Sequence, residues 1–241
     1  MLLHKFILIA CTHMEPDYDQ PQIAYDNAVA AGAGIYSKQI LSIYDLYVLG
    51  FSNTFIWQCP SRLILDFYNE HISAKHLDVG VGTGYFLDKC RFPTSNPSIT
   101  LVDLNSNSIE TTAKRLRHYS PKTYIANVLE PIQIESANFD SIALNYLLHC
   151  LPGNLLSKSV VFRNLKPLVN NEGGVIFGTT ILGQDVKQNL LAKTLMKTYN
   201  SKGIFSNTDD NLTDLESVLK ENFHDYSVRV VGCVAFFVGR I

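Results

Sequence analysis

The chain has 241 residues, 46% apolar and 17% charged, which is enough to bury one sizeable core and to form one α/β domain. Its 20 basic and 22 acidic side chains give a formal net charge of −2 without any basic run, so we expect no nucleic-acid partner. Five scattered cysteines, none in a Cys-x-x-Cys pattern, indicate neither a disulfide framework nor a metal site, and no apolar stretch reaches the roughly 20 residues that cross a bilayer, so no membrane partner is expected.

Regular hydrophobic periodicity begins only near Ile35, so residues 1–34 are predicted to be a poorly ordered leader. The first residues, MLLHKFILIAC, combine a short basic flank with a brief apolar run and imitate an export signal. The apolar run is shorter than the roughly 7–15 residues that such signals carry, so we interpret the likeness as accidental and expect a cytoplasmic protein. Met14 is an alternative start of translation.

Two helices are predicted before the first strand. From Ile35 onwards, apolar and aromatic residues recur at helical spacing, which indicates an amphipathic helix. Gly50 is predicted to end this helix, and Pro60 is predicted to open a second one. We expect residues 35–70 to form a helical cap on a single domain that covers residues 35–241.

Strand-like and helix-like segments then alternate, which implies an α/β fold with a mostly parallel sheet and helices on both faces. A separation of only two residues between the last two strands indicates a C-terminal antiparallel hairpin. The predicted strands cover residues 76–79, 99–102, 123–126, 139–144, 174–180, 226–231 and 234–238. The predicted helices cover residues 84–91, 106–118, 155–168, 185–199 and 212–222.

The most informative segment is HLDVGVGTGYFL, in which an apolar strand leads into three glycines at every second position. Gly80, Gly82 and Gly84 carry no Cβ atom, so they permit sharp bends with positive φ and let a ligand approach the main chain. Asp78 adds an acceptor just inside the strand. Tyr85 stands where the last glycine of a dinucleotide-binding fingerprint would be, which disfavours a pyrophosphate ligand.

A carboxylate closes the second strand. Asp103 lies 19 residues after Gly84, where a nucleotide-binding sheet places an acceptor for both hydroxyls of a ribose. The alternative is that Asp103 caps the helix that follows, because Asp is a good capping residue. Asn105 or Ser106 could cap that helix equally well, which would leave Asp103 available to a ligand.

Five segments occur in a fixed order along the chain: HLDVGVGTGYF, LVDLN, IANVLEP, FDSIALNYLLHCLPG and LKPLVNNEGGVIFGTT. In order and spacing they resemble the successive motifs of class I S-adenosylmethionine-dependent methyltransferases. The resemblance covers residues 35–241 and implies a Rossmann-like seven-stranded fold, with the cofactor across the carboxyl edge of the sheet. Within this class the chain is similar to small stand-alone enzymes of natural-product and quinone-type metabolism, partly through Tyr44, Asp45 and Trp57.

Motif by motif, the resemblance assigns contacts with S-adenosylmethionine. The assigned residues are Asp78, Gly80 and Gly82 for the methionine part, Asp103 for the ribose, Asn127 and Val128 for the adenine, Asn145 and Tyr146 beside the sulfonium, Gly84 and Leu104 as further cofactor contacts, and Tyr44 and Trp57 as covering contacts. The family commonly has Asp at the position of Asn127, but an amide also offers the adenine edge a donor and an acceptor.

The implied reaction is an in-line displacement, for which the protein aligns a nucleophile with the methyl group and excludes water. Neither a metal nor a covalent intermediate is required. An acceptor hydroxyl of high pKa would need a general base, and His149, beyond the fourth strand, is the candidate. The alternative is that His149 is a packed, hydrogen-bonded loop histidine.

The expected acceptor is a small molecule. The leading helices are rich in aromatic residues, which suit a flat or apolar molecule, although most such residues belong to cores. Residues 200–210, between two predicted helices, are either a second covering segment or an ordinary connection. Methylation of base amines is not supported, because Asn145 is not followed by a Pro-Pro-aromatic cluster, and cytosine C5 methylation would need a Pro-Cys nucleophile.

Two further functions remain open from the sequence. An NAD(P)-dependent oxidoreductase would also use a glycine turn and Asp103, but the glycine spacing and the terminal hairpin disfavour it. A catalytically inactive cofactor-binding partner protein would carry the same residues. The residues indicate neither the nucleophilic atom of the acceptor nor the oligomeric state.

Overall fold

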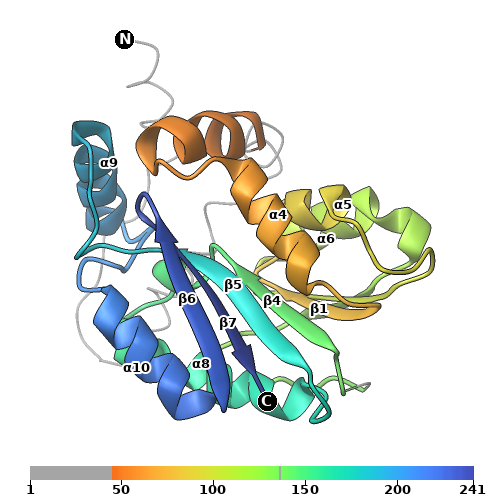
Figure 1. Cartoon of the computed structure of the whole chain (residues 1–241). Helices are drawn as coiled ribbons and strands as arrows, with labels where there is room; N and C mark the ends of the chain where they lie inside the picture. Colours follow the sequence, from red (N-terminus) through yellow and green to blue (C-terminus); the bar gives the residue numbers. More distant parts are fainter. Residues whose placement is uncertain (1–44, 136) are drawn as a thin grey trace, which may run out of the picture.

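Seven strands form one sheet in the order β3-β2-β1-β4-β5-β7-β6 (Figure 1). The structure, a computed structural model, describes residues 45–135 and 137–241, so the predicted leader lies outside it. Strands β1 to β5 pair in parallel, whereas β7 is antiparallel to both β5 and β6. The predicted α/β fold with a C-terminal antiparallel hairpin is confirmed. The strands are β1 (Lys75–Val79), β2 (Ser98–Asp103), β3 (Lys122–Ile125), β4 (Ser141–Asn145), β5 (Val175–Ile181), β6 (Asp225–Val231) and β7 (Val234–Arg240).

Helices cover both faces of this sheet (Figure 1). Across the described ranges, every helix is too short or too polar to cross a bilayer. The helical segments are η1 (Asp45–Ile56), α4 (Ser61–His71), α5 (Tyr85–Lys89), α6 (Ser106–Arg115), η2 (Arg117–Tyr119), η3 (Leu148–Cys150), α7 (Leu155–Lys158), α8 (Val160–Leu165), η4 (Lys166–Leu168), α9 (Leu190–Ser201) and α10 (Leu212–Asn222).

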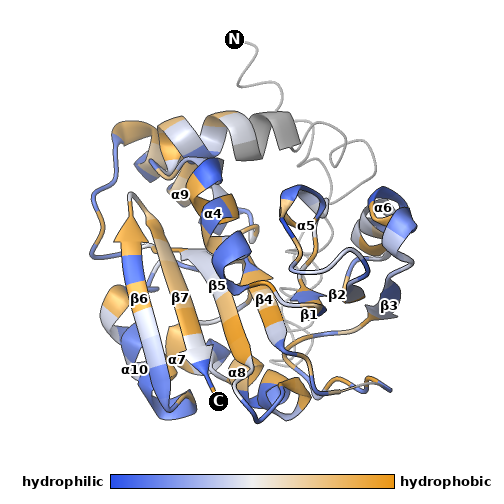
Figure 2. Ribbon diagram, turned by 45° about the vertical axis from the view of Figure 1, so that its right-hand side comes forward, coloured by the Kyte–Doolittle hydropathy of each residue, from blue (hydrophilic) through white to orange (hydrophobic). Residues whose placement is uncertain are grey.

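Side chains alternate between the two faces of the sheet and form an apolar layer on each. Ala143 of β4 and Phe236 of β7 join the layer that includes α4, α5 and α6. Ile142 and Phe237, their neighbours along the strands, join the layer that includes α7, α8 and α10. This alternation follows from the two-residue period of a strand. Because helices cover both faces, the central strands are mainly apolar, as Figure 2 shows.

The site is positioned by the parallel pairing of β1 with β2 on one side and with β4 on the other. The last residues of these strands, Val79, Asp103 and Asn145, therefore lie at the same edge of the sheet. The backbone N–H of Gly80 donates to the carbonyl of Val102 at 2.8 Å, so the turn after β1 begins directly at the strand end. The loops after all three strands meet at this edge.

The prediction that Gly50 ends the first helix is wrong. Helix η1 is a π-helix that includes Gly50 and continues to Ile56. Ser52 and Asn53 are buried, and the Asn53 amide donates to the hydroxyl of Ser61 at 2.7 Å. Tertiary contacts thus outweigh the low helix propensity of these residues. Wide π-turns of this kind are frequent at functional sites.

Two other helix boundaries differ from the prediction. The helix predicted over 185–199 starts later, because the Asn189 side chain accepts the N–H of Ala192 and caps α9. The helix predicted over 155–168 divides into α7, α8 and η4, and Pro167, which has no N–H to donate, lies in the first turn of η4.

Candidate active site

Three glycines in the left-handed region form the turn after β1. The φ angles of Gly80, Gly82 and Gly84 are +73°, +52° and +69°, which confirms the predicted sharp bend. A Cβ atom at Gly80 would lie 2.8 Å from the side chain of Leu147, and one at Gly84 would lie 2.6 Å from the side chain of Thr112. Gly82 differs, because nothing lies within 4 Å of the place of its Cβ. Gly82 therefore faces open space.

That open space is a pocket at the carboxyl edge of the sheet. It holds about 510 Å³ of space between atoms, with open solvent at its mouth included. Residues 80–87 form its floor, Tyr68 and Asp78 line one part, and Asn145 and Tyr146 line another. The structure therefore brings together Asp78, the three glycines, Asn145 and Tyr146, all of which the sequence assigned to the cofactor.

A buried chain of hydrogen bonds leads to Asp78. The Tyr68 hydroxyl donates to the Asp78 carboxylate, so the 2.9 Å contact between the Tyr68 oxygen and His76 Nε2 requires His76 to be the donor. When the His76 ring carries a single proton, its Nδ1 accepts from the Ser141 hydroxyl at 2.7 Å, and Ser141 in turn accepts the N–H of Ser73 at 2.9 Å. With this tautomer, each donor in the chain faces toward Asp78. The chain of hydrogen bonds fixes the orientation of the Asp78 side chain.

Asp103 lies beside the glycine turn. Its carboxylate accepts the N–H of Gly82 at 3.3 Å and the N–H of Asn105 at 2.8 Å. Burial raises the pKa of Asp103 to about 6, and these two hydrogen bonds oppose the shift. The cap of α6 is Asn105, whose side chain accepts the N–H of Asn107. Asp103 is therefore not needed as a cap.

Asn145 and Tyr146 shape the end of β4. The Oδ1 atom of Asn145 accepts the Thr179 hydroxyl at 3.1 Å, while its buried Nδ2 has no hydrogen-bond partner among the described residues. Tyr146 has a φ of +57°, which is strained for a residue with a side chain and is a feature that clusters at functional sites. Its hydroxyl donates to Asn53 of η1 at 3.0 Å. This bond joins η1 to the pocket.

His149, the predicted base, is not among the residues that line this pocket. It is 3% exposed, and its Nδ1 accepts the N–H of Ile181 at 3.3 Å. Its ring packs against Phe205 and Tyr146 with centroid separations of 4.5 and 5.5 Å. Burial, with a smaller contribution from the charge of Lys158, lowers the pKa of His149 to about 3. This is the placement of a packed histidine, and a group of such low pKa is a weak base.

The residues assigned to the adenine have other partners. The Asn127 amide accepts the N–H of Leu129 at 3.1 Å and donates to Glu130 at 3.2 Å, so it closes its own turn. Val128 is buried, and its carbonyl accepts from the side chain of Asn164 at 3.0 Å. These contacts hold the turn after β3 beside Asp103 without directing either side chain into the pocket.

The remaining predicted contacts lie away from the pocket floor. Leu104 is 38% exposed and does not line the pocket. Trp57 is buried in the apolar layer, where its ring centroid lies 6.0 Å from that of Phe205. Trp57 is thus a core residue, because its indole is enclosed by neighbouring apolar side chains. Tyr44 lies outside the described residues.

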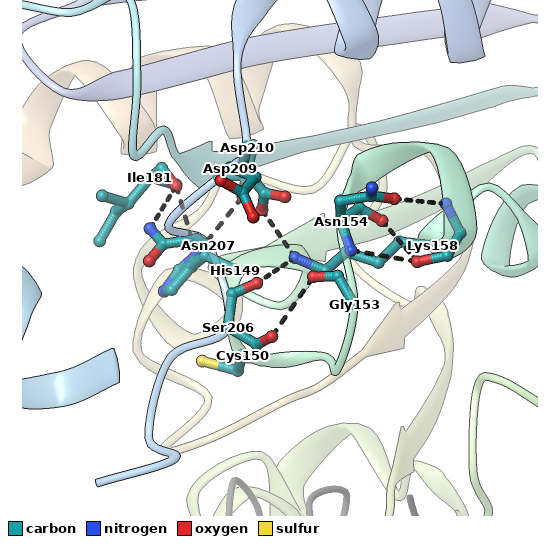
Figure 3. Close-up of polar contacts among 12 residues, drawn as sticks. His149, Cys150, Gly153, Asn154, Lys158, Ile181, Ser206, Asn207, Asp209 and Asp210 are labelled. Carbon is teal, nitrogen blue, oxygen red and sulfur yellow. Dashed lines mark hydrogen bonds and ion pairs between the residues drawn. The ribbon is translucent and has the colours of Figure 1, made fainter. Parts of the chain in front are cut away.

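A buried ion pair anchors the segment predicted over 200–210. Lys158 Nζ lies 2.6 Å from the Asp210 carboxylate and donates to the carbonyl of Ser206 at 2.6 Å (Figure 3). Both charged side chains are 1% exposed. Burial raises the pKa of Asp210 to about 6 and lowers the pKa of Lys158, whereas their mutual attraction opposes both shifts. The pair holds the segment that carries Phe205, whose ring packs against that of His149.

Two residues that the sequence did not single out contribute to the pocket region. Tyr68 of α4 contacts Asp78, and Asn53 of η1 contacts Tyr146. Both residues lie in helices before the first strand. Helical spacing predicts which residues share a face of a helix, but it does not predict the distant residues with which they form hydrogen bonds. In the described part of the chain, no three His, Cys, Asp or Glu side chains gather closely enough to hold a metal ion.

Comparisons with known proteins agree with this geometry. Residues 77–176 match the family model of a methyltransferase domain. The chain is 39% identical over 212 residues to the demethylluteothin O-methyltransferase of Streptomyces thioluteus, with 88% of this chain and 92% of that protein covered. It is 35% identical over 208 residues to the physcion biosynthesis cluster O-methyltransferase of Aspergillus chevalieri, with 86% and 93% covered. The solved DhpI–SAH complex shares the fold, with a TM-score of 0.64, 13% identity and coverage of 90% of this chain and 97% of that one.

The chain belongs to the class I S-adenosylmethionine-dependent methyltransferases. It is an enzyme that uses S-adenosylmethionine to methylate a small-molecule acceptor. The family resemblance found in the sequence is confirmed, and neither the oxidoreductase nor the inactive partner protein is favoured.

The residues at the pocket fit this cofactor in their chemistry. The open space at Gly82 lets a ligand lie against the main chain, as a cofactor cradled by the turn requires. Asp78 and Asp103 place two carboxylates next to that space, where they attract a ligand that carries an ammonium and a sulfonium group. Asn145 adds a buried donor that needs an acceptor.

Gly82→Ala tests the contribution of the turn. An alanine at a φ of +52° costs about 1–2 kcal/mol of folding stability, and its methyl group would occupy the pocket. We expect binding of S-adenosylhomocysteine, measured by calorimetry, to weaken by more than about tenfold. Gly173→Ala is the matched control, because Gly173 also has a positive φ, +93°, with nothing near its Cβ position. The control should lose stability alone, and equal loss of binding in both variants would contradict the assignment.

Lys158→Met tests the buried ion pair. The variant leaves the Asp210 carboxylate buried without its partner, so the free energy of unfolding should fall by about 3–5 kcal/mol in urea denaturation. Lys193→Met, at an exposed position on α9, should stay within about 0.5 kcal/mol of the wild type. Similar stabilities of the two variants would show that the pair does not hold the segment.

Proposed function

We propose that the acceptor atom is an oxygen of a small molecule of the natural-product type. The observation that carries this proposal is the match, over most of both chains, with relatives that are named O-methyltransferases. One of them acts in the pathway of physcion and another on demethylluteothin, by their names. The pocket, which aromatic side chains partly line, is consistent with a flat acceptor.

We assign the cofactor to the strand ends in chain order. Asp103 accepts the ribose hydroxyls, the turn from Gly80 to Gly84 lies along the methionine part, and Asp78 pairs with its ammonium group. Asn145 and Tyr146 lie beside the sulfonium. Asn127, Val128 and Leu104 border the adenine through their backbone, because their side chains are engaged or turned elsewhere.

When bound, S-adenosylmethionine supplies an activated methyl group, so the residues of the chain bind, align and exclude water. Tyr68 holds the Asp78 carboxylate in place, and Asn53 holds Tyr146 at the end of β4. His149 and Trp57 support these groups from behind as packing residues and are not proposed to touch the methyl group.

The setting that we propose is the cytoplasm, because Cys59, Cys90, Cys150 and Cys233 are all free thiols, as expected in a reducing compartment. The balanced charge argues against a nucleic-acid acceptor.

Incubation with S-adenosylmethionine labelled in its methyl group tests the proposed acceptor. We expect label on oxygen when phenols and enols are offered, as shown by mass spectrometry and nuclear magnetic resonance of the product. Asp103→Ala should reduce the rate at limiting cofactor, since it removes the ribose acceptor. Label found on nitrogen or carbon alone would overturn the assignment of oxygen.

Asp103 also makes cofactor binding depend on pH. With its pKa raised to about 6, the free protein carries a protonated Asp103 below that pH and must release the proton to accept both ribose hydroxyls. We expect the affinity for S-adenosylhomocysteine to be constant above pH 7 and about tenfold weaker at pH 5, measured by calorimetry. Asp103→Asn should bind more weakly throughout and show a flat profile. The same pH slope in the variant would contradict this role.

A further inference from the structure

A fully buried histidine lies in the middle of the sheet without a role in the proposed function. His76 is 0% exposed and is the second residue of β1, a central strand that has a parallel neighbour on each side. Such strands carry mainly apolar residues, because both of their faces are covered. A buried imidazole costs free energy unless its ring nitrogens have hydrogen-bond partners. Both nitrogens of His76 have them, and one partner lines the pocket.

The register of the sheet brings these partners to His76. Side chains alternate along a strand, so His76 and Asp78 lie on the same face of β1, and His76 pairs in register with Ser141 of β4. Ser141 Oγ lies 2.7 Å from His76 Nδ1. The Tyr68 oxygen lies 2.9 Å from His76 Nε2, and that nitrogen lies 3.8 Å from Asp78 Oδ2. Tyr68 and Asp78 line the pocket, whereas His76 and Ser141 are not among its lining residues.

The Tyr68 hydroxyl has a single proton and two neighbours that can accept it. One is the Asp78 carboxylate, and the other is His76 Nε2, which accepts only when the ring proton is on Nδ1. Ser141 favours the opposite tautomer, because its oxygen accepts the N–H of Ser73 at 2.9 Å and its proton is then available to His76 Nδ1. The ring proton therefore stays on Nε2, and the Tyr68 proton goes to Asp78.

Aromatic packing holds the two rings but does not set the direction of these protons. The ring of Phe177 on β5 lies 5.3 Å from that of Tyr68 and 6.1 Å from that of His76. Phe86 stacks on Tyr68 with a centroid separation of 6.4 Å. The packing of Tyr68 and the direction of its proton thus have different causes, so an experiment can separate them.

We infer that His76, oriented by Ser141, is a positioning residue of the cofactor site, which keeps the Tyr68 proton on Asp78 and so maintains the carboxylate in the orientation that pairs with the amino-acid part of S-adenosylmethionine. The inference rests on the proposed contact between Asp78 and the ammonium group, and it adds the residues that maintain this contact. His76 acts through Tyr68, because each hydrogen bond in a buried chain polarises the next.

Two ligands distinguish this role from a general structural one. S-adenosylhomocysteine contains the amino-acid part, whereas 5′-methylthioadenosine keeps the nucleoside and the sulfur but has only a methyl group in its place. In calorimetry, His76→Leu should weaken binding of the first about three- to tenfold, the equivalent of one hydrogen bond, and leave binding of the second within about twofold. Equal losses for both ligands, or no loss for either, would overturn the inference.

Further variants trace the path from His76 to the pocket. His76→Gln keeps an N–H that can donate to Tyr68, so it should bind S-adenosylhomocysteine within about twofold of the wild type. Tyr68→Phe combined with His76→Leu should bind no more weakly than Tyr68→Phe alone, and additive losses would show that His76 does not act through Tyr68. If His76→Leu does not fold, Ser141→Ala carries the same test, because it keeps the ring and removes the donor to Nδ1.

Nitrogen-15 nuclear magnetic resonance of protein labelled in histidine reports the tautomer itself. The signal that is lost in His76→Gln identifies the ring. We expect this ring to carry its proton on Nε2 in the free protein. A proton on Nδ1 would mean that Tyr68 donates to His76 instead of Asp78, which would overturn the inference.

Controls separate this inference from the assignment on which it rests. The ring of His71 on α4 also contacts Phe177, at 5.5 Å, but lies outside the chain of hydrogen bonds, so His71→Leu should leave both affinities within about twofold. Asp78→Asn should abolish the preference for S-adenosylhomocysteine over 5′-methylthioadenosine. If Asp78→Asn keeps this preference, the proposed ammonium contact fails. If Asp78→Asn loses it and His76→Leu keeps it, only the inference about His76 fails.

Discussion

The parallel pairing of β1 with both β2 and β4 is the constraint on which the site depends. It sets the ends of three strands side by side, so that Asp103, the glycine turn and Asn145 form one row along the edge of the sheet. The hydrogen bond from the Gly82 N–H to the Asp103 carboxylate joins two members of this row directly. A cofactor with a nucleoside at one end and an amino acid at the other matches this order of chemical groups.

Polar interactions, rather than apolar packing alone, position the groups around this edge. Tyr146 is held by Asn53 from η1, and the segment that carries Phe205 is held by the buried pair of Lys158 and Asp210. Breaking one partner of such a pair leaves a buried charge or donor, which costs more than a lost surface contact. The walls of the pocket are therefore specific in geometry, whereas its floor is set by backbone conformation.

Much of this arrangement was predictable from the sequence, because glycine spacing and strand periodicity report backbone conformation. The left-handed turn follows from the glycine spacing, the parallel sheet with its terminal hairpin follows from the alternation of strands and helices, and the clustering of Asp78, Asn145 and Tyr146 was implied by the family resemblance. Two contacts do not follow from local pattern. Tyr68 bonds to Asp78, 10 residues away in the chain, and Tyr146 bonds to Asn53, 93 residues away. Spacing also gives no side-chain direction, which is why the orientation of His149 had to come from the structure.

A crystal structure of the chain with S-adenosylhomocysteine would locate the cofactor directly. We expect the ribose hydroxyls on the Asp103 carboxylate, the amino-acid part along residues 80–84, and the sulfur on the side of the turn that faces Asn145. Density for the compound at another place, or a ribose bound without Asp103, would show that the row of strand ends is not the cofactor site, whatever the acceptor of the methyl group proves to be.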